Sequence, residues 1–158
     1  PRRAGAEDRG AAPEDRRRYL NRNMTNAQIL GAARTAAHFG IKCMTFNMIG
    51  MPFETKEDMM ATLRLNQLIQ PELFLFCQYL PLPGTPLYAE AERAGLLLAE
   101  SPACQMSNLG RLNLRPYPGS PSVEEMRAIA DRMMQFAVSN NAYDSYRPEF
   151  GPVCWHRI

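Results

Sequence analysis

The 158-residue sequence predicts an α/β fold in which helices alternate with strands of a parallel sheet. The first observation is a pair of apolar runs, 41–49 and 73–80, which glycine and proline interrupt at their carboxyl ends. Short apolar runs with such boundaries are typical of strands buried on both faces in helix-covered parallel sheets. The second observation is a helix-start signal before the first run and after each run. The resulting order, helix–strand–helix–strand–helix, predicts a parallel strand pair joined by a crossover helix.

The first helix is predicted to begin after Thr25, because Gln28 stands at the capping-box spacing from it. Gly40 provides the left-handed residue that ends many helices. His38 lies in the last turn, where the helix dipole favours a cation, and this explanation is preferred to a catalytic role. Small and apolar residues follow the helical period and suit close packing on a sheet: Ile29, Ala32, Ala33, Ala36, Ala37 and Phe39.

The second and third helices carry equally clear start signals. Thr55 has Asp58 at the capping-box position, and Pro71 marks the end of that helix. The third helix begins where Thr85 is followed by proline, which is favoured at the first helical position, and it stops at Gly95. Each cap contributes about 1 kcal/mol. Their agreement along the chain favours one architecture.

The remaining segments are less regular. Residues 1–15 have no periodic apolar positions, and we expect a loop or a disordered stretch there. Residues 111–115 can form a short edge strand, after which several prolines oppose regular structure. Capping residues and an apolar stripe predict a last helix over 122–139. The aromatic tail, 143–158, is expected to pack against the body.

Composition excludes several classes of protein. Eighteen Lys and Arg residues against sixteen Asp and Glu residues, with no basic stripe among aromatics, do not indicate nucleic-acid binding. The arginines at 16–18 are interpreted as a solvated face. No apolar run is long enough to span a bilayer, and no signal-peptide pattern opens the chain. The four cysteines lie far apart, which predicts a reducing, cytoplasmic compartment rather than a disulfide framework, and Cys154 with His156 does not complete a zinc site.

Two turns are the candidate ligand site. Residues 50–54 and 81–85 each follow a strand and precede a helix, at the edge where parallel α/β folds bind ligands. Gly50 allows a ligand to approach the backbone, although a tight strand-to-helix turn explains the same residue. Asn47 and Gln78 place amides within apolar strands, and a buried amide needs partners. Neighbouring backbone and a bound ligand, including the small substrate of some other α/β-barrel enzyme, both remain open as those partners.

Three segments together resemble a known family. They are YLNRNMTNAQIL at 19–30, NMIGMPFET at 47–55 and PLPGTPLY at 81–88. Their order and spacing are similar to the second half of radical S-adenosylmethionine (SAM) enzymes, above all those with a cobalamin-binding domain. The resemblance covers about residues 16–98. It implies an α/β fragment of a partial parallel (β/α) barrel, half of a TIM-like (β/α)6 barrel, with a helical C-terminal extension over 99–158 and a disordered or non-native leader over 1–15.

In that family a three-cysteine loop holds a [4Fe–4S] cluster, SAM chelates the cluster, and reductive cleavage of SAM starts the reaction. Some members transfer methyl groups with the help of cobalamin. The resemblance implies contact with the adenine of SAM for one group of residues from the two strand ends: Asn47, Met48, Ile49, Gly50, Gln78, Tyr79 and Leu80. It implies no catalytic residue and no metal ligand in this chain.

The sequence also departs from the family. The C-x-x-x-C-x-x-C loop is absent, and none of the four cysteines replaces it. Phe53 stands where many relatives have glycine. We therefore expect the cluster, and cobalamin where it is used, to belong to a full-length parent, with the missing N-terminal half of the barrel as the partner of this chain. The alternative is a non-catalytic α/β binding or assembly module, or the remnant of a pseudogene.

Overall fold

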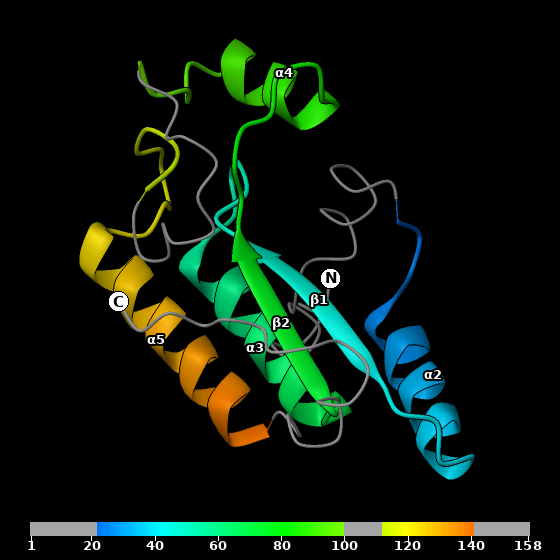
Figure 1. Ribbon diagram of the computed structural model, residues 1–158. Helices are drawn as coiled ribbons and strands as arrows, with labels where there is room; N and C mark the ends of the chain where they lie inside the picture. Colours follow the sequence, from blue (N-terminus) through cyan, green and yellow to red (C-terminus); the bar gives the residue numbers. More distant parts are fainter. Residues whose placement is uncertain (1–21, 100–111, 141–158) are drawn as a thin grey trace, which may run out of the picture.

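The computed structural model describes residues 22–99 and 112–140. These residues form four helices and two strands: α2 (Asn26–His38), β1 (Met44–Ile49), α3 (Lys56–Ile69), β2 (Leu73–Gln78), α4 (Pro86–Arg93) and α5 (Val123–Asn140). The two strands pair with each other in parallel, and α3 connects them (Figure 1). The predicted α/β class and the predicted parallel pairing are therefore confirmed. The expectations for residues 1–15, 16–18 and 143–158 lie outside the described residues.

The local signals place the helices correctly. Thr25 and Thr55 each form a complete capping box, and the Thr85 hydroxyl accepts the Tyr88 amide at 3.2 Å. The last helix begins within one residue of its predicted start. Because each cap joins groups only three residues apart, the sequence alone is sufficient to predict them.

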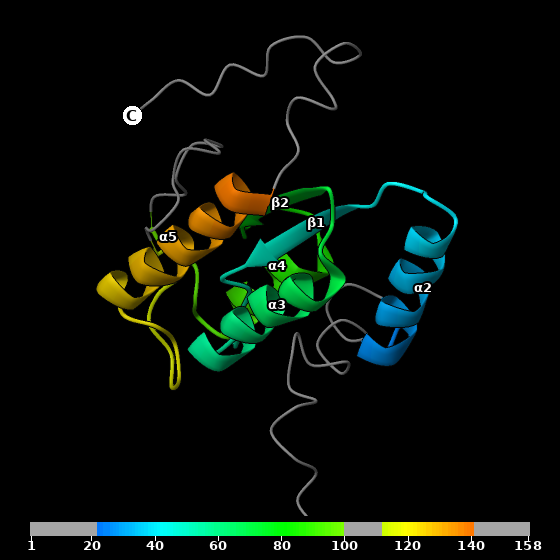
Figure 2. The same cartoon turned by 90° about the horizontal axis from the view of Figure 1, so that it is seen from below.

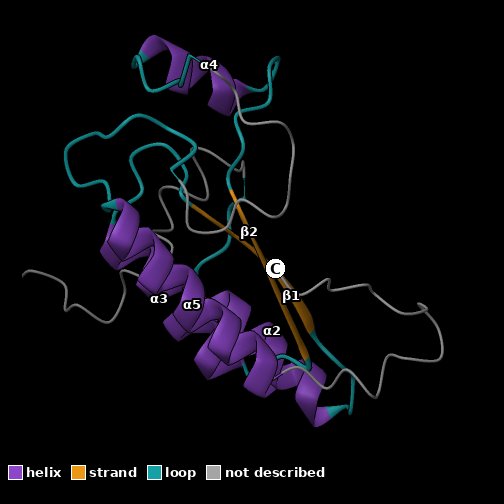
Figure 3. Ribbon diagram, turned by 60° about the vertical axis from the view of Figure 1, so that its left-hand side comes forward, coloured by secondary structure: helices purple, strands orange, loops and turns teal. Residues whose placement is uncertain are grey.

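One face of the sheet carries the main core. Helices α3 and α5 pack beside each other on this face, while α4 lies beyond the carboxyl ends of the strands (Figures 1 and 3). The buried side chains of this core come from both strands and both helices: Ile49, Met59, Leu63, Phe74, Met126, Ile129, Met133 and Ala137. Burial of each large apolar side chain stabilises the fold by about 1.5–3 kcal/mol, so α5 is an integral part of the described domain.

The prediction of strands buried on both faces is wrong for the described chain. On the second face Met44, Phe46 and Met48 are 43%, 77% and 36% exposed. Their neighbour Cys77, which pairs with Met48, is exposed as well. An apolar run indicates that the side chains on both faces of the strand are hydrophobic. Among the described elements, however, only α3 and α5 pack against the sheet, and they cover one face. We call this second face, made by Met44, Phe46, Met48, Leu73, Leu75 and Cys77, the open face.

The first strand is also shorter than predicted, with Met44 rather than Ile41 at its start. The Ile41 amide donates to the Ala36 carbonyl at 2.9 Å, and the Gly40 amide donates to the Ala37 carbonyl at 3.0 Å. This pair of bonds is the Schellman motif that ends α2. Ile41 therefore belongs to the helix cap. The second strand ends at Gln78 rather than Leu80.

Two further expectations are corrected. The small-residue stripe of α2 does not pack on the sheet: α2 contacts α3, none of its residues is buried, and Phe39 is 70% exposed (Figure 2). The edge strand expected at 111–115 is reduced to one antiparallel bridge between Leu97 and Leu114. Leu114 instead joins a second small core under α4, with Met51, Tyr79, Leu87, Ala91 and Leu96.

Within 22–99 and 112–140, none of the helices combines the length and the apolar composition needed to cross a membrane.

Candidate functional site

The turn after β1 is held in an unusual conformation by its own residues. Gly50 has φ 75° and Phe53 has φ 66°, so two residues adopt left-handed values. The buried carboxylate of Glu54 accepts the Met51 amide at 3.0 Å, and the Glu54 amide donates to the Met51 carbonyl at 3.1 Å. The left-handed value at Phe53 explains physically why glycine would suit this position, since a side chain there is strained by about 1–2 kcal/mol.

Both candidate turns lie at the same edge of the sheet. Ile49 pairs with Gln78 at the ends of the strands, and the Tyr79 amide continues the pairing by donating to the Ile49 carbonyl at 2.7 Å. A Cβ atom at Gly50 would lie 3.4 Å from both the Gln78 side chain and the Met126 side chain. Glycine is favoured here mainly by the left-handed φ of 75°, since an added Cβ would make ordinary contacts with these two side chains.

The structure identifies the partners of the Asn47 amide. Its oxygen accepts the Asn66 side-chain amide at 2.8 Å, and its nitrogen donates to the Leu75 carbonyl at 3.0 Å and to the Thr45 hydroxyl at 3.3 Å. Asn66 also accepts the Thr45 hydroxyl at 2.7 Å. The side chain of Asn47 thus lies on the helix-covered face in a polar network, and these bonds favour the protein-internal explanation over a ligand amide.

The other predicted contact residues divide between the faces. Ile49 is in the main core and Gln78 is half-buried beside Gly50, both on the helix-covered side. Met48 lies on the open face next to Cys77, and Leu80 is half-buried in the second turn. Met48 is therefore the predicted contact residue whose side chain a flat ligand on the open face can reach.

Tyr79 has a buried hydroxyl that lacks a partner. The residue is 4% exposed, and no hydrogen bond reaches its hydroxyl oxygen within the described chain. Burial also raises the pKa of this phenol above its ordinary value. An unpartnered buried hydroxyl costs about 1–3 kcal/mol, so this atom is a place where a water or a polar ligand atom would be stabilised.

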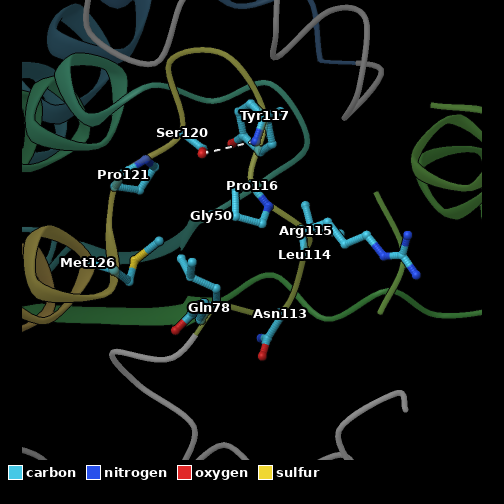
Figure 4. Close-up of a pocket in the computed structure, with 11 residues that line it drawn as sticks. Gly50, Gln78, Asn113, Leu114, Arg115, Pro116, Tyr117, Ser120, Pro121 and Met126 are labelled. Carbon is cyan, nitrogen blue, oxygen red and sulfur yellow. Dashed lines mark hydrogen bonds between the residues drawn. The ribbon is translucent and has the colours of Figure 1, made fainter. Parts of the chain in front are cut away.

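A small cavity lies at the strand ends on the helix-covered side, next to Met126 of α5 (Figure 4). It has a volume of about 20 Å³ and is bordered by Gly50, Gln78, Met126 and the segment that runs from Leu112 to Tyr117. This volume holds about one water molecule, so a purine does not fit there. A nucleobase-sized ligand needs the open face instead.

The described residues do not fit an iron–sulfur cluster. No group of three or more His, Cys, Asp or Glu side chains gathers at one place within 22–99 and 112–140. Cys43 precedes β1 and Cys77 lies near the end of β2, and both are free thiols. Cys77 is exposed as a residue, but partial desolvation of its sulfur raises the pKa of the thiol, which opposes the thiolate form that binds iron.

Two residues that the sequence gave no reason to single out also touch the strand ends. The Asn113 side-chain amide donates to the Tyr79 carbonyl at 2.8 Å. The Tyr117 hydroxyl lies 3.1 Å from the Met51 carbonyl oxygen and 2.7 Å from the Glu54 carbonyl oxygen. Partners this far apart in sequence leave no local pattern that could have revealed them.

The arrangement defines an α/β protein whose candidate site lies at the carboxyl ends of parallel strands, the usual ligand position in such folds. No family model matches the sequence. A stretch of 80 residues is 31% identical to part of a protein of Pyrococcus horikoshii described as an uncharacterized methyltransferase. The match covers 51% of this chain and 17% of that relative.

Proposed function

We propose that this chain forms the C-terminal half of a radical SAM barrel and supplies the wall beside the adenine of SAM. The observation that carries the proposal is the open face, an apolar sheet surface that ends at two strand-to-helix turns. The partial similarity to a protein described as a methyltransferase supports it, because SAM is the common biological methyl donor.

The residues at the strand ends have chemistry that suits a nucleoside. The polarizable thioether of Met48 can pack on the face of a purine. The Tyr79 hydroxyl, which lacks a partner within the described residues, is buried in the small core under α4 and would bond a ligand atom only after that core opened. Bound SAM would supply an activated sulfonium, and the described residues would bind and orient it.

The same face supports an N-terminal half of a barrel as the partner. Strand β1 has one neighbour, β2, so its second edge is unpaired within the described chain. Phe46 projects from this strand and is largely exposed. Unpaired strand edges next to exposed apolar side chains favour pairing with further strands, and in a partial barrel the preceding strand would occupy that edge.

Titration with S-adenosylhomocysteine tests the adenine wall without requiring a cluster. In the ¹⁵N-labelled full chain we expect amide shift changes at residues 47–50 and 78–80. Met48→Ala should weaken binding about fivefold, since a sulfur–aromatic contact contributes about 1 kcal/mol. Met134→Ala is the matched control, because Met48 and Met134 are both 36% exposed and Met134 lies on α5. No shift at the strand ends, or equal effects of the two variants, would refute the proposal.

The open face favours a second candidate, a non-catalytic assembly module. Phe46 would then contact another protein chain through the unpaired edge of β1. Size-exclusion chromatography of the wild type and of Phe46→Glu separates the two candidates. An oligomer that Phe46→Glu converts to a monomer, with no binding of S-adenosylhomocysteine, supports assembly, whereas a wild-type monomer contradicts it.

A further inference from the structure

One segment from the C-terminal part of the chain crosses the ends of both strands. We call residues 113–120 the strap. Its first residue, Asn113, is buried and donates to the carbonyl of Tyr79 after β2. Near its other end, the Tyr117 hydroxyl reaches the carbonyl oxygens of Met51 and Glu54 after β1. Figure 4 shows Asn113 and Tyr117 on either side of Gly50. The strap therefore bonds to the first candidate turn and to the residue that follows β2.

The strap is itself rigid. The Ser120 amide donates to the Tyr117 carbonyl at 2.9 Å, and the Tyr117 amide donates to the Ser120 hydroxyl at 3.1 Å (Figure 4). The Arg115 amide donates to the Leu96 carbonyl at 2.7 Å, and the Leu114 side chain is buried. These bonds preorganise the Tyr117 hydroxyl before any ligand binds, so it can act as a fixed point for the first turn.

The first turn needs such a fixed point. Phe53 holds a left-handed φ of 66°, a conformation that a side chain disfavours. Its ring contacts the Tyr117 ring at a centroid distance of 5.9 Å. Tyr117 therefore contacts the strained turn in two ways. Its hydroxyl bonds to the backbone of the turn, and its ring packs against the ring of Phe53.

We propose that Tyr117 and Asn113 are positioning residues that hold the turn after β1 and the end of β2 at Tyr79 in the geometry that receives the adenine of SAM. This inference rests on the proposed function. The strap acts through the backbone at Met51, Glu54 and Tyr79 and needs no contact with the ligand. Removing its hydrogen bonds should therefore loosen the turn and weaken nucleoside binding while the main core stays folded.

Tyr117→Phe tests the strap, because it deletes the hydroxyl and keeps the ring against Phe53. Hydrogen exchange of the full chain without ligand should accelerate about fivefold at the Met51 and Glu54 amides, the result of losing one net hydrogen bond. Affinity for S-adenosylhomocysteine should fall by a similar factor, and exchange in the α3 and α5 core should not change. Tyr88→Phe, on α4 and outside the strap, is the control and should alter neither measurement.

The two measurements separate the possible failures. Unchanged exchange at Met51 and Glu54 overturns the strap. Faster exchange with unchanged affinity overturns the positioning role and leaves a purely structural contact. Absence of S-adenosylhomocysteine binding in the wild type refutes the proposed function, and with it the role toward adenine, while the exchange data still decide whether Tyr117 holds the turn.

Discussion

Asn66 connects β1 to α3 through a buried polar network, and its replacement by aspartate is the most informative test of the fold. Its side-chain amide nitrogen donates to the Asn47 oxygen at 2.8 Å and to the Thr62 carbonyl at 2.9 Å. Its oxygen accepts the Thr45 hydroxyl at 2.7 Å. Asn66→Asp keeps the shape and the acceptor but replaces the donor nitrogen with a second acceptor oxygen.

The expected loss follows from these contacts. Two hydrogen bonds disappear, each with a net contribution of about 0.5–1.5 kcal/mol, and two acceptor oxygens then face a carboxylate. Asn66 is buried, so the new charge is also removed from water. We expect Asn66→Asp to lower the free energy of unfolding at pH 7 by about 3 kcal/mol. Urea denaturation followed by circular dichroism measures it.

The pH dependence gives the test a second readout. Burial and the facing oxygens should raise the folded-state pKa of the new carboxyl above its unfolded value of about 3.9. A raised folded pKa means that the variant loses stability as pH rises from the unfolded value through the folded value. The deficit relative to wild type should therefore be larger at pH 7 than at pH 4.5.

Gln67→Glu provides the matched control, since it makes the same amide-to-carboxylate change at the next, exposed position of α3. It should stay within about 0.5 kcal/mol of wild type. If Asn66→Asp behaves like Gln67→Glu at pH 7, the network does not hold β1 on α3, and the reasoning fails.

Two further predictions concern the first turn and its surroundings. Phe53→Gly should be more stable than Phe53→Ala by about 1 kcal/mol in urea denaturation, because both variants lose the ring and only glycine relieves the left-handed φ of 66°. A Phe53→Ala variant more stable than Phe53→Gly would contradict this. The salt bridge of Lys56 with Glu125, 2.8 Å long, together with the Ser122 amide, holds the pKa of Glu125 below its ordinary value. A carboxyl whose pKa is lower in the folded state than in the unfolded state stabilises the fold at pH values above the unfolded-state pKa. That stabilisation is lost as the pH falls through the folded-state pKa. Lys56→Met should thus reduce the thermal midpoint slightly at pH 7 and less at pH 3, and an equal effect at both pH values would disprove the pairing.

The open face marks the limit of what the apolar runs could predict. The sequence correctly indicated two apolar strands and their parallel pairing, because run length and bounding residues are local properties. It did not indicate that Phe46 and Met48 would be uncovered, because burial depends on which elements lie opposite. In the described chain α3 and α5 cover one face, and α2 packs beside α3 instead of over the other.

The positions of the two turns followed from the strand boundaries. The prediction that the amide of Asn47 needs partners is confirmed by its hydrogen bonds. The structure assigned the amide of Asn47 to a network with Asn66, 19 residues further along the chain. No sequence pattern connected these residues, because they meet only when α3 packs back on β1. Their spacing does not follow the period of a helix or a strand.

The sequence by itself determined where the helices begin, because a capping box joins groups three residues apart. Only the tertiary structure decided which strand face is covered and that the buried Tyr79 hydroxyl finds no partner among the described residues. It also decided that Asn113 bonds to Tyr79 after β2 and that Tyr117 bonds to the turn after β1. The physical reason is the range of the interactions. Tyr117 reaches Glu54 across 63 positions, and such a contact forms only after the helices and strands have packed.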